Sequence, residues 1–321
     1  MRYRQLGSTG LKLSEIGIGG SHFGSMSKQS DPKAIERMLR QALDSGVNFF
    51  DTADIYGQGE SERIIGRTFA ACRDRAIIAT KAGFCLSDSG KLAARLKPLI
   101  KPLLGAVKPL RRSVVQARGS QIQQDFSGDY LVQSVERSLK RLRTDYIDLF
   151  QLHEPPAEAI LDESVLAALE RLKKQGKIRF YGVACRCLDD ALLALEHAGY
   201  ASVQVEFNLY NQAAAVLLPR AQVQGVGVMA RQPFASGRLF EQLKDSAIDV
   251  ETTGAEITEE RLIRAAFQSV LRFEGVTTVI TGMRSRAHLS HNLGALDNPL
   301  LDGELSELEA ALAAVEEGVA C

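Results

Sequence analysis

Four side chains in this sequence have the types and the spacing needed to protonate a reduced carbonyl group. Asp51, Lys81 and His153 each follow an apolar segment that we expect to form a β-strand, and Tyr56 comes five residues after Asp51. Addition of a hydride to a carbonyl creates an alkoxide, which needs a proton donor as its charge develops. We expect the Tyr56 phenol to supply that proton.

The other three side chains have supporting roles in this hypothesis. The Lys81 ammonium would lower the pKa of Tyr56 by stabilising its phenolate, and Asp51 would keep a buried Lys81 charged. His153 would donate a hydrogen bond that orients the carbonyl oxygen. Each residue alone has a structural explanation, such as a helix cap, an ion pair or core packing. The combination is what indicates chemistry.

The elements that must position these residues alternate between strands and helices along a single domain, residues 1–321. Eight short apolar segments are expected strands, and stretches with apolar residues at i, i+3 and i+4 separate them. Eight such units predict a (β/α)8 TIM barrel with its active site at the carboxyl ends of the strands. The expected strands are Glu15–Ile18, Asn48–Asp51, Ala76–Thr80, Tyr146–Gln151, Ile178–Val183, Ser202–Glu206, Gly227–Ala230 and Thr278–Thr281.

Three additions to the barrel are expected. The alternating segments Tyr3–Leu6 and Leu11–Ser14 flank a Gly7–Gly10 turn and predict an N-terminal β-hairpin, and an extra helix should run from about Asp302 to Val319. A long insertion, about residues 85–127, follows the third strand. We interpret it as a lid over the active site, although its leucines could instead contact a second subunit or a surface.

Part of this insertion, residues 91–118, is strongly basic and contains no acidic residue. Its charge would attract either an anionic substrate or the phosphates of a cofactor. The eight basic residues are Lys91, Arg95, Lys97, Lys101, Lys108, Arg111, Arg112 and Arg118.

Composition suggests an ordinary globular enzyme. Lysine plus arginine equals aspartate plus glutamate, 39 each, so the overall charge does not suggest a nucleic-acid-binding protein. The five cysteines form no disulfide framework, and no signal peptide or apolar run of membrane-spanning length is present. We therefore expect a cytoplasmic protein with no transmembrane segment. Cys185 and Cys187 with His22 or His153 are too weak a pattern to predict a metal.

A doubly wound sheet is the alternative fold. Gly17, Gly19, Gly20 and Gly24 loosely resemble a dinucleotide-binding fingerprint. Their spacing is not G-x-G-x-x-G, however, and no helix begins directly after them to hold a pyrophosphate. A tight loop at the rim of a barrel explains these glycines better.

Three segments resemble the signature regions of the aldo-keto reductase family, in the same order and spacing: NFFDTADIYGQGESERIIG, ATKAG and DYIDLFQLHEPP. The resemblance extends from about Tyr3 to Leu293, outside the insertion. It implies a (β/α)8 barrel that uses NADPH, or less often NADH, to reduce an aldehyde or ketone to an alcohol. It also implies Asp51 as the partner of Lys81, Tyr56 as the general acid, Lys81 as the modulator of its pKa and His153 as the residue that orients the substrate.

The resemblance also implies a set of cofactor contacts. Gln204 would hold the nicotinamide carboxamide, the loop 233–237 would meet the pyrophosphate, and the segment 282–292 would bind the 2'-phosphate and the adenine. His22, Phe23 and Phe84 are expected near the substrate from their loop positions. The cofactor positions are Gly20, Ser21, Asp51, Cys185, Gln204, Arg231, Pro233, Phe234, Ser236, Gly237, Gly282, Arg284, Ser285, His288 and Asn292.

The sequence departs from the family pattern at three of these positions. Ala184 and Cys185 replace a common Ser-Asn pair, and His288 stands where an arginine often binds the 2'-phosphate. Arg284 and Arg286 would still favour a phosphate. Arg231 replaces an aromatic residue beside the nicotinamide, and its charge should favour the reduced cofactor over the cationic oxidised form.

Two rival functions are compatible with parts of this pattern. A redox-sensing interaction protein would keep the fold and the cofactor without turning over a carbonyl. A metal-dependent barrel lyase or hydrolase would use Asp51 and His153, would lose activity to a chelator and would not bind a nicotinamide.

Overall fold

The computed structural model describes residues 1–24, 31–86, 122–197, 199–244 and 258–319. The basic segment 91–118, with its predicted role as a lid, lies outside these ranges.

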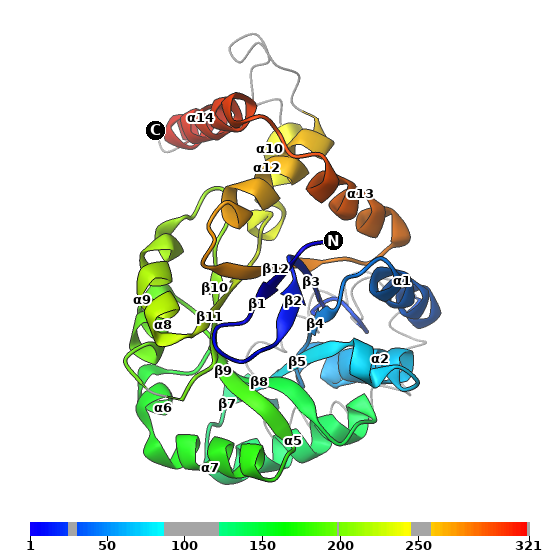
Figure 1. Cartoon of the computed structure of the whole chain (residues 1–321), viewed down its shortest axis with the longest axis vertical. Coiled ribbons are helices and arrows are strands. Elements are labelled where there is room, and N and C mark those ends of the chain that lie inside the picture. Colours follow the sequence, from blue (N-terminus) through cyan, green and yellow to red (C-terminus); the bar gives the residue numbers. More distant parts are fainter. Residues whose placement is uncertain (25–30, 87–121, 198, 245–257, 320–321) are drawn as a thin grey trace, which may run out of the picture.

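Eight parallel strands close into a barrel, in the order β10-β11-β12-β3-β4-β5-β8-β9, as predicted (Figure 1). Each observed strand overlaps the expected one, and six of them continue one to two residues further at the carboxyl end. The strands are β3 (Ile16–Gly19), β4 (Phe49–Asp51), β5 (Ile77–Ala82), β8 (Ile147–His153), β9 (Ile178–Ala184), β10 (Ser202–Glu206), β11 (Gly227–Arg231) and β12 (Val276–Gly282).

Helices surround the barrel, and α14 extends beyond it with α10, α12 and α13 (Figure 1). The first helix has a capped N-terminus, because Asp31 accepts a hydrogen bond from the Lys33 backbone N–H and Pro32 stands at the first turn. The helices are α1 (Pro32–Asp44), α2 (Glu60–Phe69), α5 (Gly128–Leu142), α6 (Ala157–Leu161), α7 (Glu163–Lys174), α8 (Leu188–Ala194), α9 (Leu218–Gln224), α10 (Arg238–Lys244), α12 (Glu259–Leu271), α13 (Arg286–Asp297) and α14 (Asp302–Val319). Short 3-10 turns lie at Tyr56–Gln58, Arg73–Arg75, Ala213–Leu217 and Ala235–Gly237.

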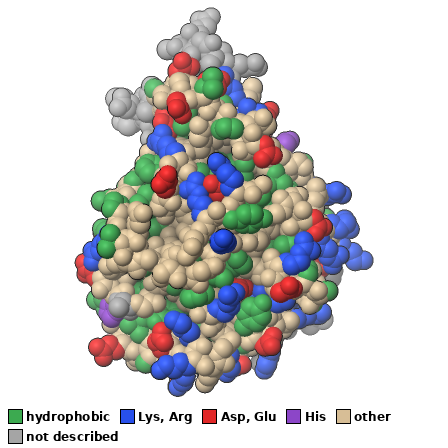
Figure 2. Space-filling view, viewed as in Figure 1, with side chains coloured by type: hydrophobic (Ala, Val, Ile, Leu, Met, Phe, Trp, Pro, Cys, Tyr) green, Lys and Arg blue, Asp and Glu red, His purple; other side chains and the backbone are tan. Residues whose placement is uncertain are grey.

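The predicted N-terminal hairpin closes the amino end of the barrel. β1 (Tyr3–Gln5) pairs with antiparallel β2 (Lys12–Ser14). Leu6, Leu11 and Leu13 are buried against apolar side chains that point into the barrel. Figure 2 shows this face, on which acidic and basic side chains lie among one another rather than in one region of a single sign.

The interior changes from apolar to polar within one step of the strand repeat. Phe49, Ala79 and Leu149 belong to the apolar layer against the hairpin. Side chains two residues apart on a strand point to the same face. The next interior layer therefore consists of Asp51, Lys81 and Gln151, which are all buried. A dry apolar layer thus supports a polar layer at the carboxyl end.

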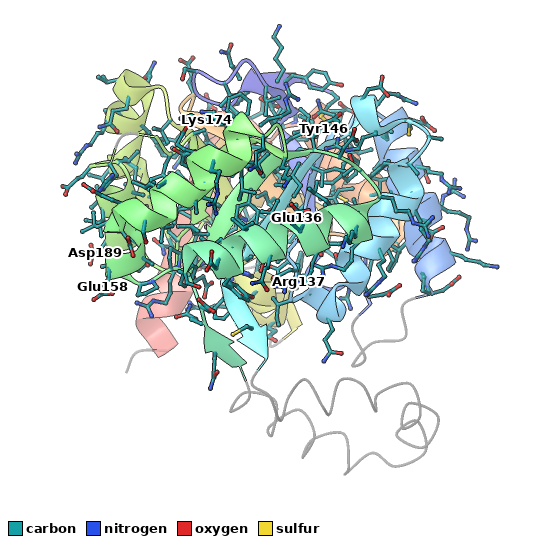
Figure 3. The ribbon with its side chains drawn as sticks, turned by 90° about the horizontal axis from the view of Figure 1, so that it is seen from below. Glu136, Arg137, Tyr146, Glu158, Lys174 and Asp189 are labelled. Atoms are coloured by element: carbon teal, nitrogen blue, oxygen red, sulfur yellow. The ribbon has the colours of Figure 1, made fainter. Side chains whose placement is uncertain are left out.

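A second hairpin, which the sequence did not predict, stands at the base of the insertion. β6 (Phe84–Leu86) pairs with antiparallel β7 (Ile122–Gln124). In Figure 3, which is turned by 90° from Figure 1, the β6–β7 hairpin lies at one end of the barrel and the N-terminal hairpin lies at the other. The helices α5 and α7 pack side by side between the two hairpins. The strands are three residues long, too short for a recognisable alternation.

Candidate active site

The four predicted catalytic residues meet at the carboxyl end of the barrel. Lys81 Nζ lies 2.6 Å from Asp51 Oδ2 and donates a second hydrogen bond of 2.9 Å to the Thr52 carbonyl. The Asp51 and Lys81 side chains are only 4% and 2% exposed. Lys81 Nζ also lies 5.4 Å from the centre of the Tyr56 ring. A buried ammonium, held by a carboxylate, therefore stands beside the phenol.

His153 lies close to the Tyr56 ring. The two rings are 5.6 Å apart and nearly perpendicular. Phe84 contacts the other side of His153, with ring centres 4.9 Å apart at 80°. His153 ends β8 and is buried. Tyr56 and Phe84 thus both pack nearly perpendicular to the imidazole of His153.

Burial decides the direction of each pKa in this group. Burial raises the pKa of Tyr56, and the charge of Lys81 opposes this rise without reversing it. Lys81 therefore lowers the pKa of Tyr56 as expected, but desolvation of the phenolate has the larger effect. Burial likewise raises the pKa of Asp51 against the effect of Lys81. The pKa of His153 is well below its usual value, because of burial and then the charges of Lys81 and Arg231.

These shifts leave a protonated phenol and a neutral imidazole near neutral pH. A phenol with a raised pKa keeps its proton until a strong base forms beside it, and an alkoxide is such a base. A neutral imidazole still has one N–H to donate. The group can therefore hold a carbonyl oxygen and protonate it.

Several supporting residues were missed by the sequence analysis. Gln151 Nε2 approaches Asp51 Oδ1 at 3.4 Å from the neighbouring interior position of β8. Thr52 Oγ1 donates to Ser61 Oγ at 2.7 Å, and Ser61 Oγ donates to the Gly20 carbonyl at 2.9 Å. Gln151 was detectable, because it stands two residues before His153 on the same strand and so shares its face. The hydroxyl chain depends on the packing of α2 and had no comparable signal.

Arg231, at the end of β11, is held across the mouth of the barrel. Its Nη2 donates to the Cys185 carbonyl at 3.1 Å and lies 3.8 Å from a carboxylate oxygen of Glu154. Glu154 follows His153 with a positive φ of 52°, which is unusual for a residue with a side chain. The Cys185 thiol itself is buried, and burial raises its pKa. The carbonyl of Cys185 thus contacts Arg231 while its side chain packs inward.

The polar atoms at this end of the barrel fit an amide-bearing cofactor. The buried atoms Gln204 Oε1, Gln151 Oε1 and His153 Nδ1 have no hydrogen-bond partner in the part of the chain that the structure describes. Buried polar atoms are costly unless a partner satisfies them. Gln204 lies in β10 and faces Asp51. The amide oxygen of Gln204 is thus buried without a partner among the described residues, and the N–H of a ligand carboxamide would satisfy it.

The predicted adenine-side residues gather at the start of α13. The Ser285 side chain caps the helix by accepting a hydrogen bond of 3.2 Å from the His288 backbone N–H. The charge of nearby Arg284 contributes, after burial, to a lowered pKa of His288. Asn292 is buried two turns further along, and Gly282 is exposed at the end of β12. Arg286 is less available than expected, because its Nε is hydrogen-bonded to Gln41 of α1.

The predicted pyrophosphate loop has an unusual backbone. Ser236 has a φ of 59° and Gly237 a φ of 105°, and the Gly237 N–H donates to the Phe234 carbonyl at 2.8 Å. Phe234 packs its ring near Phe240 and Phe267, and Pro233 is buried. The rings anchor the loop while Ser236 stays exposed.

The residues predicted near the substrate differ in their positions. Phe84 contacts His153, and His22 and Ser21 are exposed beside Gly20. Phe23 is fully buried in the main core, so its ring is not open to a substrate. That expectation is corrected, because loop position alone did not show that the ring turns inward.

The described ranges contain neither a cluster of metal-ligating side chains nor a membrane-spanning helix. No three histidine, cysteine, aspartate or glutamate residues there are placed to hold a metal ion. None of the helices there has the length and apolar character needed to cross a membrane.

Comparison with known proteins identifies the class. The profile of the Aldo/keto reductase family, whose members are nicotinamide-dependent oxidoreductases, matches residues 15–313. The chain belongs to the aldo/keto reductase family. The family's activity is NAD(P)H-dependent oxidoreduction of carbonyl compounds.

Individual relatives agree over nearly the whole chain. The uncharacterized oxidoreductase YqkF of Bacillus subtilis (strain 168) is 29% identical, covering 97% of this chain and 96% of its own. L-galactose dehydrogenase of Arabidopsis thaliana is also 29% identical, over 98% of this chain and 95% of its own. Among solved structures, the holo form of aldo-keto reductase AKR11C1 from Bacillus halodurans matches with a TM-score of 0.75 and 26% identity. The match covers 97% of this chain and 96% of that chain.

Proposed function

We propose that the protein reduces an aldehyde or a ketone to an alcohol, with NADPH as the preferred hydride donor and NADH as an alternative. Tyr56 is the general acid in this proposal. The observation that carries it is the convergence of three groups at one place: the Tyr56 phenol, the buried Lys81 ammonium and the neutral His153 imidazole.

The protein's own residues handle the proton. A bound reduced nicotinamide supplies the hydride to the carbonyl carbon. The Tyr56 O–H bond breaks as the carbonyl oxygen becomes an alkoxide, and its proton goes to that oxygen. Lys81 stabilises the phenolate that remains, which recovers a proton from solvent. His153 holds the carbonyl oxygen in line through a hydrogen bond.

The preference for NADPH rests on the start of α13. Arg284 and the capped helix N-terminus at Ser285 offer a positive charge and backbone N–H groups, which suit a 2'-phosphate. Gln204 would hold the nicotinamide carboxamide, and its unpartnered amide oxygen supports this assignment.

We also infer that anionic carbonyl compounds are favoured substrates. The positive charge of Arg231 acts on Tyr56 and His153, as its effects on their pKa values show. A carboxylate or phosphate near the reacting carbonyl would be attracted by the same charge.

One experiment tests the proposal. NADPH fluorescence is followed on adding protein, and a panel of neutral and anionic aldehydes and ketones is then assayed. Tyr56→Phe should lower kcat by roughly 100-fold or more while leaving the Kd for NADPH unchanged. Tyr146→Phe is the control, since Tyr146 lies near the end opposite the β6–β7 hairpin (Figure 3). Binding without turnover of any carbonyl would favour a sensor, and absence of binding would refute the proposal.

A further inference from the structure

Asp54 is a carboxyl group that the proposed chemistry does not use, although it lies inside the catalytic loop. It stands between Asp51 and Tyr56, and its backbone N–H donates to the Lys81 carbonyl at 3.0 Å. Its Oδ1 is enclosed and has no hydrogen-bond partner among the described residues. A buried carboxylate oxygen without a partner is unfavourable, whereas the neutral acid is much less so.

A second carboxyl group faces Asp54 from α2. Glu62 is fully buried; its Oε1 accepts a hydrogen bond of 2.7 Å from Thr80 Oγ1, and its Oε2 accepts one of 2.5 Å from Arg141 Nε. Arg141 therefore neutralises Glu62. Like charges at short range disfavour a second ionised carboxylate, so the site accommodates one negative charge more readily than two.

The remaining charged and titratable groups near Asp54 come from α5. The exposed Arg137 donates to Ser134 Oγ at 2.9 Å and lies 5.7 Å from the Tyr130 ring. Tyr130 donates to the Phe84 carbonyl at 3.1 Å. Burial, followed by the charge of Asp54, raises the pKa of Tyr130 to about 12, so the phenol stays neutral. The hydrogen bonds described for Arg137 and Tyr130 are thus made to groups other than Asp54.

These surroundings favour the protonated form of Asp54. Burial, and then the charge of Glu62, raises its pKa to about 7, although the charges of Arg141 and Arg137 and a hydrogen bond from the Ile55 backbone oppose the rise. Ionisation would require the enclosed oxygen to gain water or another partner. The segment 52–56 would have to move for this, and it carries both Tyr56 and the Thr52 carbonyl that binds Lys81.

We propose that Asp54 is a positioning residue that holds the Lys81 and Tyr56 side chains in register as a neutral acid, and that loss of its proton disorders this arrangement and limits activity at alkaline pH. The inference rests on the proposed reductase function. It assigns the alkaline limit to a residue that does not touch the substrate.

The pH profile of kcat/KM separates this role from a merely structural one. The kcat/KM of the wild type should fall above about pH 7, whereas that of Asp54→Asn should not change with pH. The kcat/KM of Asp54→Asn divided by that of the wild type should therefore rise about tenfold or more between pH 6.5 and 8.5. Asp189→Asn, at an exposed position on α8 (Figure 3), is the matched control and should follow the wild type. Parallel profiles for wild type and Asp54→Asn would overturn the proposal.

A second variant covers the case in which Asp54→Asn does not fold. Arg137→Gln removes an exposed positive charge that lowers the pKa of Asp54, so the alkaline limit should move to higher pH. An unchanged or acid-shifted limit would count against Asp54.

Thermal unfolding without cofactor tests Asp54 independently of activity. The folded state holds this proton more tightly than the unfolded state, so wild-type stability should fall as pH rises from about 4 to about 7. Asp54→Asn should lack that part of the fall. Equal pH dependence would overturn the inference, whereas absence of carbonyl reduction at every pH would refute the proposed function alone.

Discussion

Removal of the Lys81 ammonium should destabilise the folded protein strongly. Lys81→Met leaves the Asp51 carboxylate buried with the neutral amides of Gln151 and Gln204 in place of an ammonium, and deprives the Thr52 carbonyl of the Lys81 hydrogen bond. Breaking a buried ion pair by removing one partner costs about 3–5 kcal/mol. At roughly 2–4 °C per kcal/mol for a chain of this size, the Tm should fall by on the order of 10 °C.

The size of the loss should depend on pH. Without Lys81, the pKa of Asp51 should rise further, because burial already raises it and the opposing charge is gone. The folded state then binds the Asp51 proton more tightly than the unfolded state, so stability declines as pH increases. Lys81→Met should therefore lose more stability relative to the wild type at pH 8 than at pH 5.

A double-mutant cycle measures this coupling by chemical or thermal unfolding without cofactor. Asp51→Leu combined with Lys81→Met replaces the pair by apolar side chains, and most of the cost should be recovered. A coupling free energy of about 2 kcal/mol or more is expected. If the two single changes simply add, the pair does not stabilise the site in the way its geometry indicates.

Two smaller predictions concern the cofactor side. Gly20→Ala should lower the free energy of unfolding by about 1–3 kcal/mol, because the new Cβ would lie 2.5 Å from Ser61 Oγ. The control Gly294→Ala, whose Cβ would have nothing within 4 Å, should be neutral or stabilising in the same unfolding assay. Glu154→Gln removes the countercharge of Arg231, so the Kd for NADP⁺ relative to that for NADPH should rise by about two- to fivefold. Fluorescence titration measures both Kd values. If Glu154→Gln raises the ratio of the Kd values equally in an Arg231→Leu background, the charge explanation is contradicted.

The succession of elements and the catalytic group could be predicted from the sequence because both are local in origin. Strand and helix periodicities are written into short segments, and parallel strands bring their carboxyl ends to one edge. Asp51, Lys81 and His153 close three strands that are consecutive in the predicted order, so their convergence followed from the barrel itself.

Other features were decided only by tertiary structure. Phe23 turns inward because the loop after β3 packs into the main core. The β6–β7 hairpin pairs segments from the two ends of the long insertion, which are far apart in the sequence. The net rise in the pKa of Tyr56 depends on how fully the phenol is enclosed relative to its distance from Lys81. Asp54 and Glu62 come together because α2 packs against the barrel wall. Burial and charge distance act between residues remote in sequence, and no local pattern specifies them.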